Sequence, residues 1–249
     1  MARLARWMRP WWFPLAVLAL FEFYARSVAP GSDTLAPPTT ALRALAGAAM
    51  DGSLVQATAF TLAAAASGLA LAALPGIPLG LSRRASQMSL LTVELMRPVP
   101  SVALIPLAML VFGFGLRLES AVVAFASFWP LLILTQSAVA QVEPRLLEVS
   151  HVLGLTPWQR GVKIVLPAIV PRLFVALRLG VAVSLVVAVT VEIAANPEGM
   201  GYAMMIAQQS LDPALMLAWL AWIGVVGYAI NFAALKLQRW VARKMGAAQ

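Results

Sequence analysis

The most informative part of the chain is EPRLLEVSHVLGLTPWQRGVKIVLPAIVP, from Glu143 to Pro171. It separates two long apolar runs and is too long to be a simple connection, so we expect it to have structure of its own. Pro144 suits the first turn of a helix, and no helix breaker follows it before Leu153. Gly154 then stands where the end of a helix favours a residue that accepts a positive φ.

A second short helix is predicted directly after this glycine. Thr156 suits the N-cap, Pro157 the first helical position and Gln159 the third, which is the pattern of a capping box. We expect this helix to end near Leu166, because Pro167 disfavours helical geometry in the residue before it. The stretch therefore predicts two short helices joined by a rigid corner. They form either a protruding docking element or an amphipathic hairpin on a membrane surface.

The rest of the chain is unusually poor in charge. Of its 249 residues, 61% are hydrophobic and only 11% are charged, whereas about 25% of the residues of a soluble domain are charged. This composition excludes an ordinary soluble domain. It also excludes a disordered chain, which needs low hydrophobicity and high net charge.

Six segments are long and apolar enough to cross about 30 Å of hydrocarbon as helices, the form that satisfies the backbone internally. They lie near residues 10–29, 56–82, 89–113, 119–140, 172–195 and 214–236. We expect residues 30–53 to form an outer loop that leads into a short helix from about Pro38 to Met50. The chain is thus expected to be one membrane domain, residues 1–249, with 143–171 as a loop within it.

The basic residues orient these segments. With six crossings, four clusters fall on one side: Arg3, Arg6 and Arg9; Arg83 and Arg84; Arg145, Arg160, Lys163 and Arg172; and Lys236, Arg239, Arg243 and Lys244. The positive-inside rule predicts that this side, with both termini, is cytoplasmic. The net charge of +8 is also compatible with nucleic-acid binding, but basic residues spread over an apolar chain favour a membrane protein and no nucleic acid.

The first segment has a second interpretation. Arginines followed by an apolar stretch and small residues are typical of a cleavable signal peptide. The length of the stretch, its tryptophans Trp7, Trp11 and Trp12, and Pro30 directly after the cleavage position favour a retained span instead.

Residue counts exclude several kinds of chemistry. The chain has no cysteine and a single histidine, His151, which argues against thiolate or histidine metal sites. It has no G-x-x-x-x-G-K-[ST] loop, so it does not hold nucleotide phosphates in that way. We expect no catalytic residue, no metal and no cofactor in this chain.

The 143–171 loop resembles the EAA loop of ABC-importer permeases, in which Glu-Ala-Ala is followed by three residues, a glycine, nine residues and Ile-x-Leu-Pro. This chain has Glu148, Gly154 and Pro167 at that spacing, with Val149 and Ser150 in place of the alanines. Further stretches resemble the nitrate/sulfonate/taurine-type branch of this family. Among them are LMRPVP at 95–100, FGFG at 112–115 and GMGY at 199–202, and the resemblance covers roughly residues 38–240.

The resemblance implies an all-α polytopic membrane protein with six transmembrane helices and a cytoplasmic helix–turn–helix coupling loop, the type I ABC importer permease fold. It implies a permease subunit of the bacterial inner membrane that carries a small solute, such as the anions nitrate and sulfonate, or taurine. It also implies partners: a second copy of the permease, two cytoplasmic subunits that bind ATP and Mg²⁺, and an external substrate-binding protein. The alternative is a self-contained secondary transporter or channel, which would show inverted repeats.

Two groups of candidate residues follow. The group expected to contact the ATP-binding subunits lies in the loop: Leu147, Glu148, Ser150, His151, Leu153, Gly154, Leu155, Thr156, Pro157, Trp158, Leu166 and Pro167. Of these, Glu148 is also compatible with a solvated charge on a helix face.

The group expected to line the substrate path comprises Arg97, Pro98, Pro100, Ser127, Trp129, Gln136, Ser184 and Glu192. Prolines that interrupt a span are tolerated beside a cavity, and ionisable residues within spans usually face the interior. Glu94 and Arg97, three positions apart, are expected to pair. Glu192 is equally compatible with the path and with the wet outer interface.

Overall fold

The computed structural model describes residues 12–28 and 35–244, and every regular element within them is helical. In chain order the elements are α2 (Trp12–Ser27), α3 (Pro38–Met50), α4 (Ser53–Leu81), α5 (Arg83–Met96), the 3₁₀ turn η1 (Ser101–Leu104), α6 (Ile105–Phe112), α7 (Leu116–Ala140), α8 (Pro144–Val152), α9 (Pro157–Arg160), the π-helical turn η2 (Gly161–Val165), α10 (Leu166–Ala194), α11 (Met200–Gln209) and α12 (Pro213–Lys244). The predicted short helix from Pro38 to Met50 is confirmed with the same bounds.

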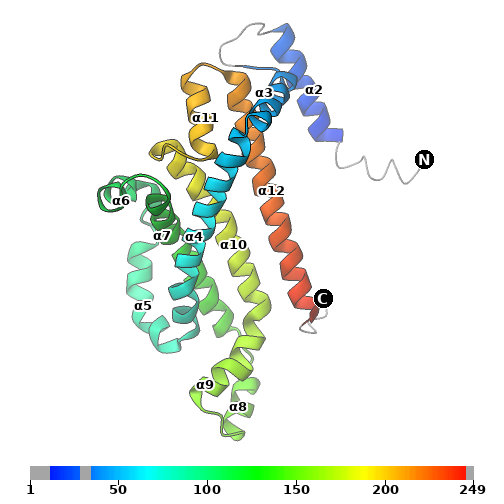
Figure 1. Ribbon diagram of the computed structural model, residues 1–249. Coiled ribbons are helices and arrows are strands. Elements are labelled where there is room, and N and C mark those ends of the chain that lie inside the picture. Colours follow the sequence, from blue (N-terminus) through cyan, green and yellow to red (C-terminus); the bar gives the residue numbers. More distant parts are fainter. Residues whose placement is uncertain (1–11, 29–34, 245–249) are drawn as a thin grey trace, which may run out of the picture.

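Four long helices, α4, α7, α10 and α12, run along the length of the molecule (Figure 1). The most extensive contact joins α4 to α7, and small residues on α4 allow it. A Cβ atom on Gly68 would lie 2.5 Å from the Cβ of Val123, and one on Gly80 would lie 2.6 Å from the Cβ of Thr135. Glycine therefore lets the two backbones approach more closely than larger side chains would, as is common between membrane helices.

The prediction of six continuous spans is only partly confirmed. Within the described residues, four helices are long and apolar enough to cross a membrane: Ser53–Leu81, Leu116–Ala140, Pro157–Ala194 and Pro213–Lys244. They match the predicted segments 56–82, 119–140, 172–195 and 214–236. The first predicted segment corresponds to α2, which has 16 residues, while its residues 10, 11 and 29 lie outside the described part.

The predicted span 89–113 is wrong as a continuous helix. Helix α5 ends at Met96, Pro100 is extended, and the chain re-enters helical geometry only through η1 and α6. Proline has no N–H to donate and clashes with the preceding turn, so Pro98 and Pro100 break the helix. The expected single span is replaced by helices α5 and α6, which are separated by a non-helical segment and the turn η1.

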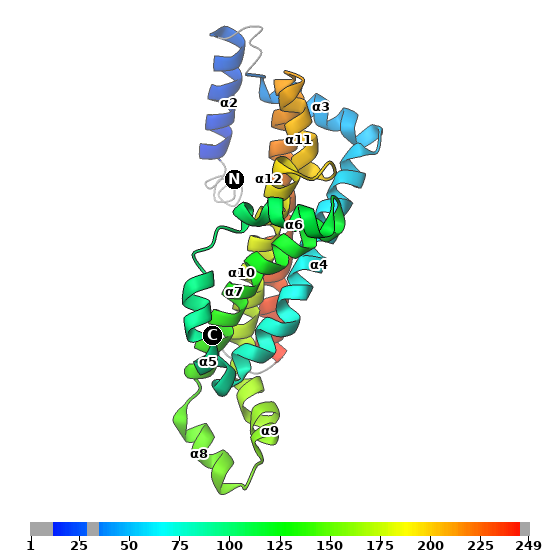
Figure 2. The same ribbon diagram turned by 90° about the vertical axis from the view of Figure 1, so that its left-hand side faces the viewer.

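The described basic clusters lie at one end of the molecule. Helices α8 and α9, the junction of α4 with α5, and the C-terminal end of α12 gather there, while α3 and α11 lie at the opposite end (Figures 1 and 2). This arrangement matches the grouping predicted from the charges. The predicted cluster of Arg3, Arg6 and Arg9 lies outside the described residues.

Candidate functional site

The loop at this end begins with the predicted helix α8 and closes it with a Schellman motif. Gly154 has φ +63°. Its N–H donates to the carbonyl of His151 at 3.0 Å, and the Leu155 N–H donates to the carbonyl of Ser150 at 3.1 Å. These two bonds satisfy the last carbonyls of the helix. The predicted role of Gly154 at a helix end is confirmed.

The predicted capping box at the second helix is also confirmed. The Gln159 N–H donates to Thr156 Oγ1 at 3.3 Å, and the Thr156 N–H donates to Gln159 Oε1 at 3.0 Å. Two N–H groups that lack helical partners are thereby satisfied. The corner between α8 and α9 is consequently fixed at both ends by local bonds.

The prediction that this second helix ends near Leu166 is wrong. The helix runs without interruption from Pro157 to Ala194. The Leu166 N–H donates to the carbonyl of Gly161, five residues earlier, which is π-helical spacing. A proline in an α-helix clashes with the carbonyl four positions before it, and the wider turn directly before Pro167 relieves that clash.

Two of the loop candidates face the bundle. Ser150 is buried and its hydroxyl donates to the carbonyl of Leu147. Leu147 is half-buried against a cluster that includes Val139, Val142 and Ile169. These contacts seat α8 on the lower ends of α7 and α10.

Most of the other loop candidates are exposed. Two of them, Leu153 and Trp158, form an apolar corner together with Val152. The exposed fractions are 65% for Leu153 and 79% for Trp158, and that of Val152, which directly precedes Leu153, is 88%. Glu148, His151, Thr156, Pro157 and Pro167 are exposed, whereas Leu155 and Leu166 are half-buried. Sequence reasoning missed Val152; its position three residues after the exposed Val149 places both on one helix face and gives the signal.

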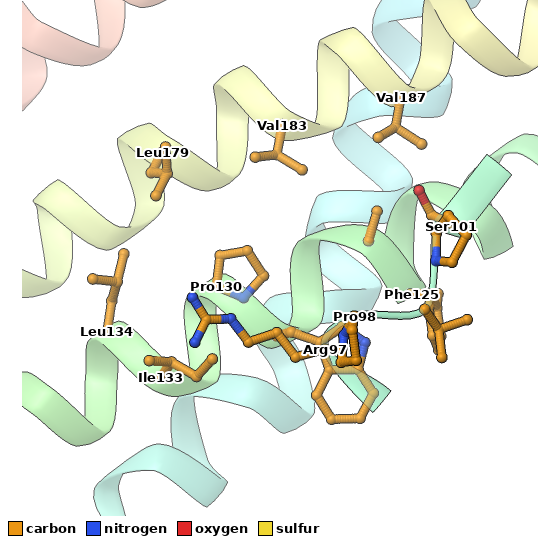
Figure 3. A pocket seen from close by; sticks show the side chains of 14 residues that line it. Arg97, Pro98, Ser101, Phe125, Pro130, Ile133, Leu134, Leu179, Val183 and Val187 are labelled. Atoms are coloured by element: carbon orange, nitrogen blue, oxygen red, sulfur yellow. The ribbon is translucent and has the colours of Figure 1, made fainter. Parts of the chain in front are cut away.

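A cavity of about 560 Å³ opens beside the break between α5 and η1. Phe125, Ala126, Trp129, Pro130, Ile133 and Leu134 of α7 line one side, and Leu179, Val183 and Val187 of α10 line another. Arg97, Pro98, Pro100 and Trp129 of the predicted substrate path lie together here. Figure 3 shows the guanidinium of Arg97 reaching past Pro130 toward Ile133, with the α10 residues across from it.

The cavity is apolar apart from a few groups. The predicted ion pair between Glu94 and Arg97 is not formed. The ion pair found among the described residues joins Arg26 to Glu22. The indole Nε1 of Trp129 is buried and finds no hydrogen-bond partner in the described chain. The edges of Phe125 and Phe128 meet the Trp129 ring at centroid distances of 5.7 and 4.8 Å, which fixes the orientation of the indole.

The remaining path candidates do not line this cavity. Ser127 is buried in α7, and Gln136 lies further along the same helix. The hydroxyl of Ser184 donates to the carbonyl of Val181 at 2.9 Å. Glu192 lies elsewhere, in a buried polar cluster at the opposite end of α10 from the loop.

That cluster, formed by Thr61, Glu119, Glu192 and Asn196, joins four helices. The Gly201 N–H donates to Glu192 Oε2 at 2.7 Å, and the Met200 N–H donates to Thr61 Oγ1 at 3.0 Å. Glu192 and Thr61 thus cap the N-terminus of α11, where a carboxylate is favoured by the helix dipole. Sequence reasoning missed Glu119 and Asn196, although a glutamate at the start of a predicted span is itself a signal.

Comparison with known proteins decides which family this arrangement belongs to. The sequence model of the family described as binding-protein-dependent transport system inner membrane component matches residues 66–247. The chain belongs to this family of permeases. The resemblance seen in the coupling loop and in the branch motifs is confirmed.

Two relatives of this permease illustrate the family. The chain is 28% identical over 201 residues to the bicarbonate transport system permease protein of Synechococcus elongatus, covering 79% of this chain and 72% of the relative. It is 29% identical over 194 residues to the taurine transport system permease protein of Escherichia coli, covering 76% and 70%. The permease is thus a transmembrane subunit of an ABC importer and a multi-pass protein of the inner membrane.

The fold has a solved counterpart. An inward-facing structure of the MetNI methionine ABC transporter matches with a TM-score of 0.68 at 21% sequence identity, covering 77% of this chain and 97% of that chain. At this identity the match concerns the fold alone. The match supports the predicted all-helical fold of a type I importer permease.

Proposed function

We propose that two copies of this permease form the path of an importer for a small organic or inorganic anion. An external binding protein delivers the solute, and two cytoplasmic subunits bind ATP and Mg²⁺ and drive the change between inward- and outward-facing states. The likeness to permeases named for bicarbonate and taurine transport supports the solute class. Each of those solutes carries an anionic oxygen group.

The end that carries α8 and α9 is proposed to be cytoplasmic, together with both termini. The basic residues of α8, α9 and the last turns of α12 lie at this end, and an excess of arginine and lysine is typical of cytoplasmic loops. In this orientation the apolar corner faces the ATP-binding subunits.

The observation that carries the proposal is the apolar corner formed by Val152, Leu153 and Trp158. Large apolar side chains at such exposure on a rigid, capped corner are costly in water and indicate a protein interface. Tryptophan is enriched among the residues that dominate binding energy at interfaces. We infer that Trp158 and its neighbours insert into a groove of the ATP-binding subunit, with Glu148 at the rim.

Co-purification tests this proposal. The importer subunits are expressed together, and the amount of ATP-binding subunit recovered with the tagged permease is measured for Trp158→Ala and for Gly154→Pro. Since truncating a central interface residue costs about 2 kcal/mol or more, we expect recovery of the ATP-binding subunit to fall at least about tenfold in both variants.

Met50→Ala is the matched control, because Met50 is as exposed as the corner residues but lies at the opposite end. It should leave recovery unchanged, and the size-exclusion profile should show that all three variants fold. Full recovery with Trp158→Ala, or solute uptake that continues without ATP, contradicts the proposed coupling. Uptake without ATP would favour the secondary-transporter alternative.

A further inference from the structure

Arg97 is a cation without a counter-charge beside an apolar cavity. It directly follows Met96, the last residue of α5. None of the described residues that line the cavity is acidic, and Glu94, one turn earlier, forms no ion pair with it. Arginine is rare in the membrane part of a protein, where it is usually paired or part of a substrate or ion path.

The surrounding residues favour an anion with oxygen acceptors. Guanidinium groups bind carboxylate and related oxyanions through paired N–H donors. Ser101 and Trp129 also line the cavity. The Nε1–H of Trp129 has no hydrogen-bond partner within the described chain, and its ring is held by Phe125 and Phe128. Pro98 and Pro100, which flank the cavity opening, bring no N–H donors of their own.

The size of the cavity agrees with a small solute. Its volume of about 560 Å³ lies within the about 300–1,000 Å³ typical of small-molecule sites. Apolar walls from Val183, Val187 and Leu179 lower the local dielectric, so that a single positive charge acts more strongly on a passing anion than it would in water.

We propose that Arg97, assisted by the Trp129 indole N–H, is the anion-selecting site of the path and binds the oxyanion group of the solute during transport. This inference rests on the proposed function for the identity of the solute, but the site itself can be tested without transport. The single positive charge of Arg97 in a cavity without acidic lining residues selects a monoanionic sulfonate, carboxylate or bicarbonate group over a cation or a neutral molecule of the same shape.

The absence of cysteine from the sequence makes a direct test possible. Ser101 lines the cavity, so Ser101→Cys places a single thiol beside Arg97. In the purified permease, we would measure the labelling rates of this thiol by the anionic sulfonatoethyl methanethiosulfonate and by its cationic trimethylammonium-ethyl counterpart. Arg97→Gln should lower the ratio of anionic to cationic labelling rates at least about tenfold, and Arg97→Lys should largely preserve it.

Two controls accompany this measurement. Met50→Cys, at the far end of α3, should show a ratio that does not respond to Arg97→Gln. Glu94→Gln should leave the ratio of anionic to cationic labelling rates at Ser101→Cys unchanged. A higher ratio in this variant would show that Glu94 neutralises Arg97 and would overturn the proposal.

A second measurement tests recognition of the oxyanion itself. Labelling of Ser101→Cys by the neutral reagent N-ethylmaleimide is followed with methanesulfonate or with dimethyl sulfone, a neutral molecule of similar shape, at constant ionic strength. We expect methanesulfonate alone to slow labelling, by about fivefold or more, with the effect abolished by Arg97→Gln and weakened by Trp129→Phe.

Equal slowing by both compounds, or slowing by methanesulfonate that survives Arg97→Gln, would overturn the anion site. These results do not depend on the ATP-binding subunit or on uptake. A failure of the anion site is therefore distinguishable from a failure of the proposed importer function, which co-purification and ATP-dependent uptake report.

Discussion

The side-chain amide of Asn196 donates a hydrogen bond of 2.8 Å to Glu119 Oε2, across 77 positions of sequence. The carbonyl oxygen of the same amide accepts the Gly115 N–H at 2.9 Å. One buried side chain therefore joins the segment after α10 to the residue that precedes α7 and to the first turn of that helix. Without Asn196, the Gly115 N–H and Glu119 Oε2 would each lose this hydrogen bond in the protein interior, where polar groups are almost always paired.

Replacing Asn196 by alanine should destabilise the permease. The change leaves the Gly115 N–H and one Glu119 oxygen without these partners, at a cost of about 1–3 kcal/mol. In detergent, the midpoint of thermal unfolding followed by tryptophan fluorescence should fall by about 2–4 °C for each kcal/mol. Asn231→Ala is the control, since Asn231 is exposed and accepts from Arg178 Nε at the surface; an equal loss in both variants would contradict the structural role of Asn196.

Gly199→Ala should be more harmful than Gly52→Ala. Both glycines have positive φ, +95° and +83°, and both substitutions therefore introduce backbone strain. Only at Gly199 does the added Cβ also overlap a side chain, because it would lie 2.0 Å from Glu192 Oε1. We expect losses of about 1–2 kcal/mol for Gly52→Ala and about 2–5 kcal/mol for Gly199→Ala with its overpacking, measured by the same unfolding assay. Similar midpoints for the two variants would show that contact with Glu192 is unimportant.

Gly68→Ala and Gly47→Ala should change stability in opposite directions. At Gly68 the new methyl group meets Val123 at 2.5 Å in the α4–α7 contact, whereas at Gly47 in α3 it meets nothing within 4 Å. Overpacking at Gly68 should cost about 1–3 kcal/mol, while alanine at Gly47 should stabilise the helix by about 0.5–1 kcal/mol. The two unfolding midpoints, measured side by side, decide this; a stabilising Gly68→Ala would refute the close approach of α4 and α7.

Thr156→Ala should loosen the corner without unfolding the bundle. Loss of the capping hydroxyl costs about 0.5–2 kcal/mol, which corresponds to an increase of roughly 2- to 30-fold in the opening equilibrium of the first turn. Hydrogen exchange measured by mass spectrometry should show faster exchange of the Gln159 amide, with exchange in α7 unchanged. Thr156→Ser, which keeps the hydroxyl, should exchange like the wild type, and slow exchange in Thr156→Ala would rule out the cap as the main constraint.

Local sequence signals predicted the coupling loop well because its structure depends on local bonds. Gly154 and Thr156 satisfy groups within a few residues of themselves, so turn and cap preferences were sufficient. The end of the second helix was mispredicted, because the restriction imposed by Pro167 was overcome by the π-helical turn before it. The π-helical turn lies at Gly161–Val165, so the local preference of the dipeptide Leu166-Pro167 does not predict it.

The break in the predicted span and the cavity beside it were signalled by residues at which several features coincide. Arg97, Pro98 and Pro100 combine a charge with helix breakers in one apolar segment, and they lie together at the cavity. Ser127 and Ser184 were single polar residues on helices, and a small hydroxyl can be satisfied by its own helix, as Ser184 is. Glu119 and Asn196 meet only through the fold, across 77 positions, so no local pattern could pair them.

The uninterrupted helix of 38 residues from Pro157 to Ala194 is about 57 Å long. It carries Trp158 of the exposed corner at its second position and Val183 of the cavity wall about 38 Å further along. Ile169, which is fully buried, lies between the two. The corner and the cavity are therefore joined by the backbone hydrogen bonds of a single helix and not only by contacts between separate elements.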